Sequence, residues 1–165
     1  MPLAVILSDA AMVALSVGAL LAALYERNRT LEHWHVLLPG LLSAGAAFAI
    51  VAYPRLSDLW EAERLLVFAL VLLAGVARGA MATVVTDHVH GLGQLRPSPD
   101  ALVVAGLQVA FAAIDTALDI QAGGLTHVTS TIEAIQIVAA AYLLGRSFGL
   151  WQKMRRGTSV ELLKD

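Results

Sequence analysis

The chain has 165 residues, of which 58% are hydrophobic and 15% charged, and its net charge is −2. Ordinary soluble domains have roughly 45–50% apolar residues, so this composition, with a mean hydropathy of +0.74, predicts an integral membrane protein. The absence of cysteine excludes disulfide bonds, thiolate metal sites and thiol redox catalysis. The lack of a basic excess argues against nucleic acid as a partner.

Five apolar stretches are each close to the ~20 residues that a helix needs to cross the ~30 Å hydrocarbon core of a bilayer. Their expected limits are residues 3–24, 34–53, 64–86, 101–120 and 128–148. All five must be helical, because lipid cannot satisfy exposed backbone groups. The short connections make successive spans antiparallel neighbours. We therefore expect an all-α polytopic membrane protein, with one domain of five transmembrane helices packed as a compact antiparallel bundle in residues 1–150.

The first stretch is interpreted as a retained span rather than a signal peptide. Residues 1–3 include no basic side chain, and the apolar run that continues to Leu24 is longer than a usual signal-peptide core.

Basic residues fall unevenly on the two sides of the predicted spans. One side has Arg27, Arg29, Arg96, Lys153, Arg155 and Arg156, whereas the other has Arg55 and Arg64. The positive-inside rule then predicts that the amino terminus is outside and the carboxyl terminus inside. A bacterial inner (cytoplasmic) membrane is the expected location, and residues 151–165 are expected to be a short cytoplasmic tail at the membrane interface.

Three spans have an acidic side chain in the predicted hydrocarbon region, where insertion of a charge costs roughly 2.5–3.5 kcal/mol. With a helical rise of 1.5 Å per residue, Asp9, Asp115 and Glu133 lie at nearly the same depth in the outer half of the bilayer. Asp119 lies nearer the outer boundary. This predicted layer of acids is the strongest functional signal in the sequence, because ionisable residues in a membrane are functional by default.

Polar residues recur at helical spacing around these acids. The fourth span has Gln108, Asp115 and Asp119 on one face, the fifth has Thr129, Glu133 and Gln136, and the first has Asp9 and Ser16. Side chains at these spacings share one helix face, so we expect the three polar stripes to face one another inside the bundle.

Two kinds of chemistry fit such a layer. Desolvation disfavours the charged form of a carboxyl group, so that a proton can bind and leave. Several carboxylates together with hydroxyl and amide oxygens can also hold a hard cation such as Na⁺, Ca²⁺ or Mg²⁺. The alternative is structural: protonated acids can hydrogen-bond to neighbouring helices and simply hold the bundle together.

One arginine also lies within a predicted span. Arg78 is slightly inside the bilayer centre, so a partner is expected. Asp115 is the preferred partner and Asp9 the second choice. A structural ion pair is favoured over gating or binding of an anionic substrate.

Histidines gather at the predicted cytoplasmic boundary, and the metal-ligand candidates there are His33, His35, Asp87, His88 and His90. These are enough ligands for Zn²⁺, Cu²⁺, Ni²⁺ or Fe²⁺. Residues at i and i+2 point to opposite sides of a helix, so each pair would need a non-helical cap to chelate, and ordinary interfacial histidines are the simpler interpretation. A haem would require His35 to face His88 and is favoured less than a metal ion.

Gly75 and Gly79 form a GxxxG motif in the third span. Such a motif allows two helices to approach closely, and it fits packing within the bundle as well as it fits a dimer face.

No P-loop, nucleophile elbow or HExxH motif is present, so no enzyme class is indicated and a non-enzymatic role is favoured. The first hypothesis is movement of a proton or cation through the acidic layer, with a homo-oligomer or partner completing a transporter. The second is a non-catalytic accessory or structural subunit of a larger membrane complex, of respiratory or photosynthetic type. The third is a membrane metal- or haem-binding redox protein. The acidic layer places the first hypothesis ahead of the others.

Overall fold

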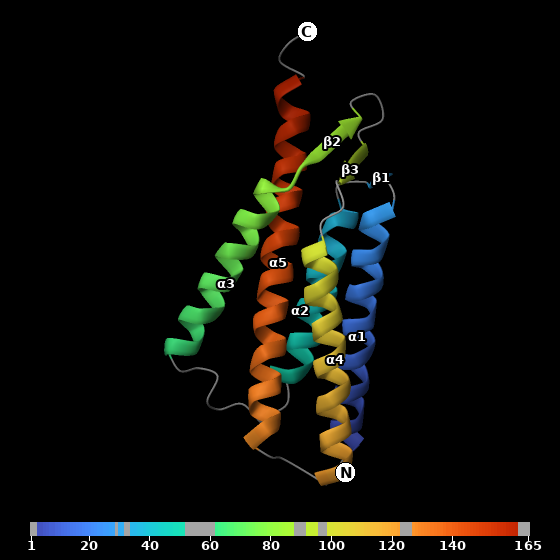
Figure 1. The fold of residues 1–165 in the computed structure, drawn as a ribbon, viewed down its shortest axis with the longest axis vertical. Coiled ribbons are helices and arrows are strands. Elements are labelled where there is room, and N and C mark those ends of the chain that lie inside the picture. Colours follow the sequence, from blue (N-terminus) through green and yellow to red (C-terminus); the bar gives the residue numbers. More distant parts are fainter. Residues whose placement is uncertain are drawn as a thin grey trace.

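The computed structural model describes residues 3–28, 30–31, 34–51, 62–87, 92–95, 99–122 and 127–161. Within these residues the main elements are five α-helices: α1 (Leu3–Asn28), α2 (Leu38–Val51), α3 (Ala62–Met81), α4 (Pro99–Ala122) and α5 (His127–Glu161). A single 3₁₀ turn, η1 (His35–Leu37), precedes α2. The predicted helical fold is confirmed, and Figure 1 shows the helices running along the long axis of the molecule.

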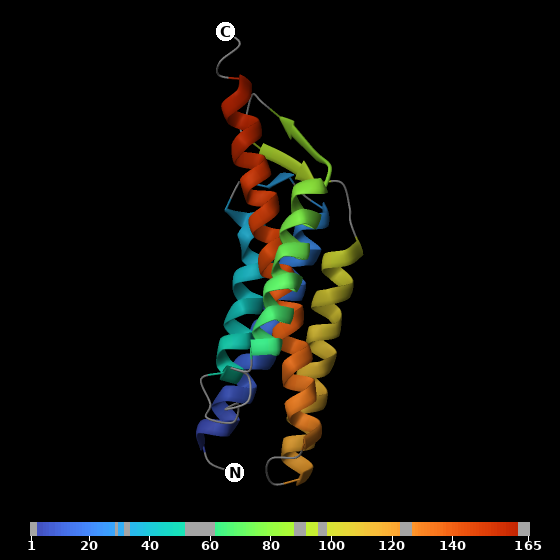
Figure 2. The same ribbon diagram turned by 90° about the vertical axis from the view of Figure 1, so that its left-hand side faces the viewer.

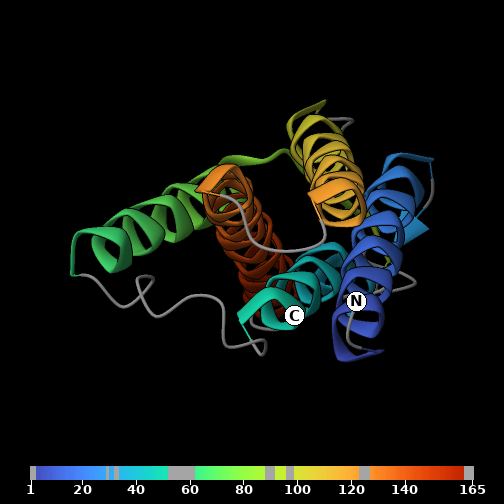
Figure 3. The same cartoon turned by 90° about the horizontal axis from the view of Figure 1, so that it is seen from below.

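The helix α5 is the central element of the bundle. It packs against α2, α3 and α4, while α1 packs against α2 and α4. Figure 3, which views the bundle along its axis, shows α5 between α3 on one side and the group of α1, α2 and α4 on the other. The helix α3 packs chiefly against α5, and Figure 1 shows it leaning away from the other helices.

A small antiparallel sheet lies at the end of the bundle where α1 and α3 finish, called here the sheet end (Figure 2). Its strands β1 (Thr30–Leu31), β2 (Val84–Asp87) and β3 (Leu92–Leu95) are ordered β1-β3-β2, with Val84 paired to Leu95 and Thr30 to Gln94. This sheet was not expected from the sequence, and the third span was expected to continue to residue 86. The helix instead ends at Met81 because the β-branched residues that follow favour a pleated strand.

Several other helix limits differ from expectation, most clearly those of α1 and α5, where the helix continues further along the chain. The helix α1 continues to Asn28, and α5 continues through Glu161. Most of the expected interfacial tail, residues 151–161, thus continues α5 as a helix, because no proline interrupts this stretch. The location of these residues at the cytoplasmic membrane interface stays a prediction. The single domain in residues 1–150 stays a prediction.

Among the helices of the described residues, three are long and apolar enough to cross a membrane: Ile6–Glu26, Pro99–Gln121 and Thr131–Arg155. The apolar helices His35–Ile50 and Leu65–Met81 are shorter. Large apolar side chains point outwards on these helices; examples are Leu7, Leu21, Phe48, Leu66, Leu73, Val103 and Ile120. The interior is instead rich in alanine and polar side chains. This is the distribution of a membrane protein, whose apolar surface faces lipid and whose small residues allow close helix packing.

Close packing of α3 on α5 depends on two glycine pairs. A Cβ atom on Gly75 or Gly79 would overlap the backbone of Tyr142 or Arg146 in α5. Gly145 and Gly149 of α5 are in the same situation against the backbone of α3. The GxxxG motif of α3 thus meets a second GxxxG motif in α5, and within this structure it serves packing inside the bundle.

Candidate functional site

A cluster of apolar side chains provides a reference level in the bundle. Met12 of α1, Ile50 of α2 and Ala112 of α4 form a buried cluster, and Ile137 of α5 packs against it. These residues come from four helices, so they lie at one level along the bundle axis. Polar residues on the same helix faces can therefore be placed above or below this level by counting helical turns.

The three acids of the predicted layer lie at one level. Asp9, Asp115 and Glu133 are each about one helical turn beyond the apolar cluster, and in all three helices this turn leads away from the sheet end. Asp115 and Glu133 are buried and Asp9 is half-buried. We call Asp9, Asp115 and Glu133 the acidic layer. Each of the three side chains has an interaction partner, so the layer is part of a wider polar interior.

Asp119 extends this polar interior by one further turn of α4. Its side chain is almost completely buried. The same face of α4 continues in the other direction with Asp115 and Gln108, so all three polar residues of the predicted stripe are buried together with Ala112 between them. Asp119 was expected near the outer boundary of the membrane. Its burial shows that this face of α4 points towards the neighbouring helices.

The Gln108 amide bonds to α2. Its Oε1 atom accepts a hydrogen bond of 2.5 Å from the Ser43 hydroxyl, and its Nε2 atom lies 3.4 Å from the Ser43 carbonyl oxygen. Both side chains are fully buried. Gln108, predicted as part of an ion site, therefore holds α4 against α2, and this partner could not be predicted from the sequence.

The Gln136 amide is in a different situation. This side chain of α5 is fully buried, yet neither Oε1 nor Nε2 has a hydrogen-bond partner among the described residues. Ser16 of α1 is also fully buried, and its hydroxyl likewise has no hydrogen-bond partner among the described residues. Buried polar groups in proteins are nearly always hydrogen-bonded, to protein or to ordered water. These atoms therefore mark places where interior water is expected.

A second polar cluster lies nearer the sheet end and consists of four charged residues and a tyrosine from four helices. Arg146 of α5 donates from Nη1 to Oε2 of Glu26 in α1 at 3.1 Å, and its Nε lies 3.5 Å from Oδ2 of Asp100 in α4. Tyr142 donates its hydroxyl proton to the same Asp100 oxygen at 3.0 Å. Arg78 of α3 approaches that oxygen at 3.2 Å. We call these five residues the ion cluster.

The ion cluster corrects the prediction for Arg78. Its partner in the structure is Asp100 rather than Asp115 or Asp9. Asp115 lies about four helical turns, or ~22 Å, further along α4, so it is out of reach. The Arg78 side chain is also 48% exposed. Arg78 was expected deep in the bilayer because the predicted third span continued to residue 86, five residues past the observed end of α3.

The other members of the ion cluster were missed. Glu26 and Asp100 lie just outside the limits expected for the first and fourth spans, residues 3–24 and 101–120. Arg146 had a usable signal, because it is an arginine inside the predicted fifth span, at residues 128–148. An arginine at such a position requires a buried partner, and Glu26 supplies it.

The metal site that was predicted from histidines at the cytoplasmic boundary lies mostly outside the described residues. This applies to His33, His88 and His90, and the side chain of Asp87 at the end of β2 is also not described. His35 is described: its ring stacks on Trp34 with 3.8 Å between the ring centroids. Among the residues that the structure describes, no group of three or more His, Asp or Glu side chains is placed to hold a metal ion.

The fold and these two polar clusters define a helical membrane protein with a polar interior. No protein-family model, curated protein or solved structure matches this chain. Its chemistry must therefore be inferred from its own residues. The interior offers carboxyl groups that can bind and release a proton, and amide and hydroxyl groups beside them that can bond to water.

Proposed function

We propose that this protein moves a proton, or a small cation, through the interior of a five-span bundle by means of the acidic layer. The observation that carries the proposal is the common level of Asp9, Asp115 and Glu133 on three different helices. Burying carboxyl groups costs free energy, and a bundle held only by packing has no need to place several of them at one level. Proton binding and release is a use that accounts for this cost.

Buried polar groups of Ser16 and Gln136, which lie between the acidic layer and the sheet end, support the same proposal. Proton movement needs a chain of groups that both donate and accept hydrogen bonds. Ser16 and Gln136 supply such groups and have polar atoms that no described residue satisfies. Asp119 extends the chain of groups towards the end of the bundle opposite the sheet end.

The proposed topology has five spans, with the amino terminus outside and the sheet end inside. Helices α1, α4 and α5 have the length and apolarity of spans, and the shorter α2 and α3 would cross with them. In this orientation the acidic layer lies nearer the outer side of the membrane and the ion cluster lies nearer the inner side. The basic side chains of Lys153 and Arg155 then lie on the inner side, as the positive-inside rule requires, in a bacterial inner membrane.

Proton flux into proteoliposomes that enclose a pH-sensitive dye tests this proposal. Flux through the purified protein should disappear when Asp115→Asn and Glu133→Gln are combined, because an amide cannot release a proton. Thr116→Val is the matched control, since the Thr116 hydroxyl donates to the carbonyl of Ala112 in its own helix at 2.9 Å. Flux that survives in the double variant would rule out the acidic layer as the proton site.

An accessory subunit of a larger membrane complex is the second candidate, and the packing of α3 favours it. This helix packs chiefly against α5, and large apolar side chains on its remaining surface are exposed, such as Leu66 and Leu73. A second copy or another membrane protein could cover this surface as well as lipid does. The native mass of the protein extracted in mild detergent distinguishes these cases, because a monomer of 17.4 kDa would count against a subunit role.

A further inference from the structure

The helices α3 and α4 are joined at the sheet end and diverge towards the other end of the bundle. Nε of Arg78 in α3 donates to Oδ2 of Asp100 in α4 at 3.2 Å. Within the described residues the two helices do not pack along their length, and each packs on α5 instead. Figures 1 and 3 show α3 leaning away, with α5 between it and the rest of the bundle. On this side of the molecule α5 is therefore flanked by α3 and α4.

Four large apolar side chains on this side are 40–50% exposed. They lie seven, eleven or fourteen residues from Arg78, Asp100 or Tyr142 of the ion cluster on the same helix, and this spacing keeps them on the same helix face as that residue. We call them the α3–α4 surface: Val67 of α3, Leu107 and Ile114 of α4, and Ile135 of α5. The exposure of Ile135 shows that neither flanking helix covers this part of α5.

The sheet end of this surface is cationic. Arg78 is 48% exposed, and its bond to Asp100 uses Nε, one of the five N–H donors of a guanidinium group. Lys153 of α5 donates to the carbonyl oxygen of Ala80, two residues after Arg78, so a second positive charge lies within about one helical turn. The ion cluster and Lys153 together have three cations and two carboxylates.

The length of the surface matches one leaflet of a bilayer. Arg78 and Val67 are eleven residues apart on α3, which is ~16 Å at the helical rise, and half of a hydrocarbon core is ~15 Å thick. Arg78 lies three residues before the end of α3 at Met81. If α3 crosses the membrane, this arginine lies at the level of the phospholipid headgroups. The surface thus fits a molecule with an anionic head and apolar chains of one leaflet's length.

We propose that the α3–α4 surface binds an anionic phospholipid of the leaflet at the sheet end, with its phosphate at Arg78 and an acyl chain along Ile135. Arginine binds phosphate through charge-assisted hydrogen bonds, and basic residues between membrane helices bind anionic headgroups. Other apolar faces of the bundle offer lipid only a contact surface, whereas this one adds a cation that Asp100 holds in position. The lipid site needs α3 in the membrane, as in the proposed topology, and does not need proton movement.

Native mass spectrometry of the purified, delipidated protein in detergent tests this site. We expect the protein to retain phosphatidylglycerol in preference to phosphatidylcholine. Arg78→Gln should lower the affinity for phosphatidylglycerol about fivefold, as expected for one basic residue near a headgroup, and Arg78→Lys should retain most of it. Equal retention of the two lipids, or an affinity that Arg78→Gln leaves unchanged, overturns the proposal.

Arg155→Gln is the matched control for the charge. Arg155 is also an exposed basic residue towards the sheet end, but it lies over the ring of Trp151 on another face of α5. Its loss should leave the affinity for phosphatidylglycerol unchanged. If Arg155→Gln lowers the affinity as much as Arg78→Gln does, the lipid is attracted by general positive charge and the site does not exist.

The acyl-chain contact has its own pair of variants. Ile135→Asn should weaken binding of phosphatidylglycerol, because it places a polar amide against the acyl chain. Leu21→Asn introduces the same amide on α1, where the side chain is 60% exposed, and should leave binding unchanged. Equal affinities of these two variants would place the acyl chain elsewhere and overturn the proposal.

The position of α3 is measured separately, so that failure of the topology can be told from failure of the lipid site. Leu66→Cys is introduced into the cysteine-free chain and labelled with a fluorophore; Leu66 is 61% exposed on α3. Phospholipids with brominated acyl chains should quench this label in vesicles. Absence of quenching would reject both the five-span topology and the lipid site. Quenching without selective retention of phosphatidylglycerol would reject the lipid site alone.

Discussion

Arg146 of α5 and Glu26 of α1 form an ion pair in the interior of the bundle, with 3.1 Å between Nη1 and Oε2 and only 5% of either side chain exposed. The two residues are far apart in the sequence, at the end of the first long helix and in the middle of the last. The pair ties these helices together near the sheet end. It also orients Arg146 so that its Nε atom reaches Asp100 of α4.

We predict that removing one partner of this pair destabilises the bundle strongly. Arg146→Met should cost about 3–5 kcal/mol in the free energy of unfolding, because it leaves the Glu26 carboxylate buried without its counter-charge. Adding Glu26→Gln to Arg146→Met should recover part of that loss. Unfolding in a denaturing detergent titration measures both effects. A double variant that is less stable than Arg146→Met would contradict this account of the pair.

The glycine contacts between α3 and α5 lead to a second prediction. Gly145→Ala should destabilise the protein by about 1–3 kcal/mol, as overpacking does, because the added methyl group meets the backbone of Leu72. Gly106→Ala is the control, since a Cβ atom there meets nothing within 4 Å. That substitution should instead stabilise α4 by up to about 1 kcal/mol through helix propensity. Equal thermal stabilities of the two variants in detergent would count against the close packing.

The two buried glutamines should respond differently to the same substitution. Gln108→Met should cost about 1–3 kcal/mol, because it leaves the polar groups of Ser43 buried without their partner. Gln136→Met should be close to neutral, since no described residue bonds to the Gln136 amide and the substitution releases only water. Denaturant unfolding of both variants makes the comparison. If Gln136→Met proves as damaging as Gln108→Met, the amide has a protein partner and the water site near the acidic layer does not exist.

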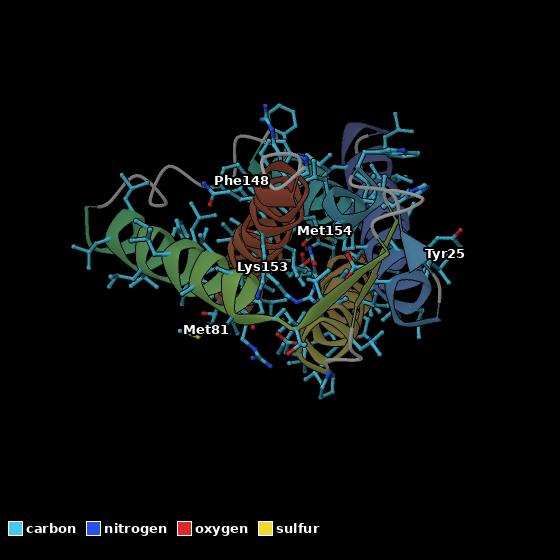
Figure 4. The ribbon with its side chains drawn as sticks, turned by 90° about the horizontal axis from the view of Figure 1, so that it is seen from above. Tyr25, Met81, Phe148, Lys153 and Met154 are labelled. Atoms are coloured by element: carbon cyan, nitrogen blue, oxygen red, sulfur yellow. The ribbon has the colours of Figure 1, made fainter. Side chains whose placement is uncertain are left out.

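Lys153 forms hydrogen bonds with the carboxyl end of α3, and these bonds lead to a fourth prediction. Its ammonium group donates to the carbonyl oxygens of Ala80 and Ala82 at 3.1 and 2.8 Å, and Figure 4 shows it extending from α5 on the side of α3. A cation at a helix carboxyl end is stabilising. Lys153→Met should therefore lower the unfolding free energy by about 1–2 kcal/mol and should raise hydrogen exchange at the last turn of α3.

Arg155→Met is the control for that substitution. The Arg155 guanidinium lies over the ring of Trp151, 5.4 Å from its centroid, and removing it should leave exchange in α3 unchanged. If the two variants give the same exchange pattern, the effect reflects loss of positive charge from this part of α5 and not loss of the hydrogen bonds from Lys153 to Ala80 and Ala82.

The sequence by itself determined that this is a helical membrane protein, where its long helices lie, and which of their faces are polar. These properties follow from composition and from the helical period, both of which are local to each segment. The buried positions of Gln108, Asp115, Asp119, Glu133 and Gln136 agree with the faces that the period indicated. A polar residue on an apolar helix has only one energetically acceptable direction, which is away from lipid.

Only the tertiary structure decided which residues meet. The pairing of Arg78 with Asp100, of Arg146 with Glu26 and of Gln108 with Ser43 depends on how far each helix is rotated and shifted against its neighbours. Helical spacing contains no information on those rotations and shifts. They are set by close contacts such as Gly79 on the backbone of Arg146, because a missing side chain allows two helices to approach at one register and not at others.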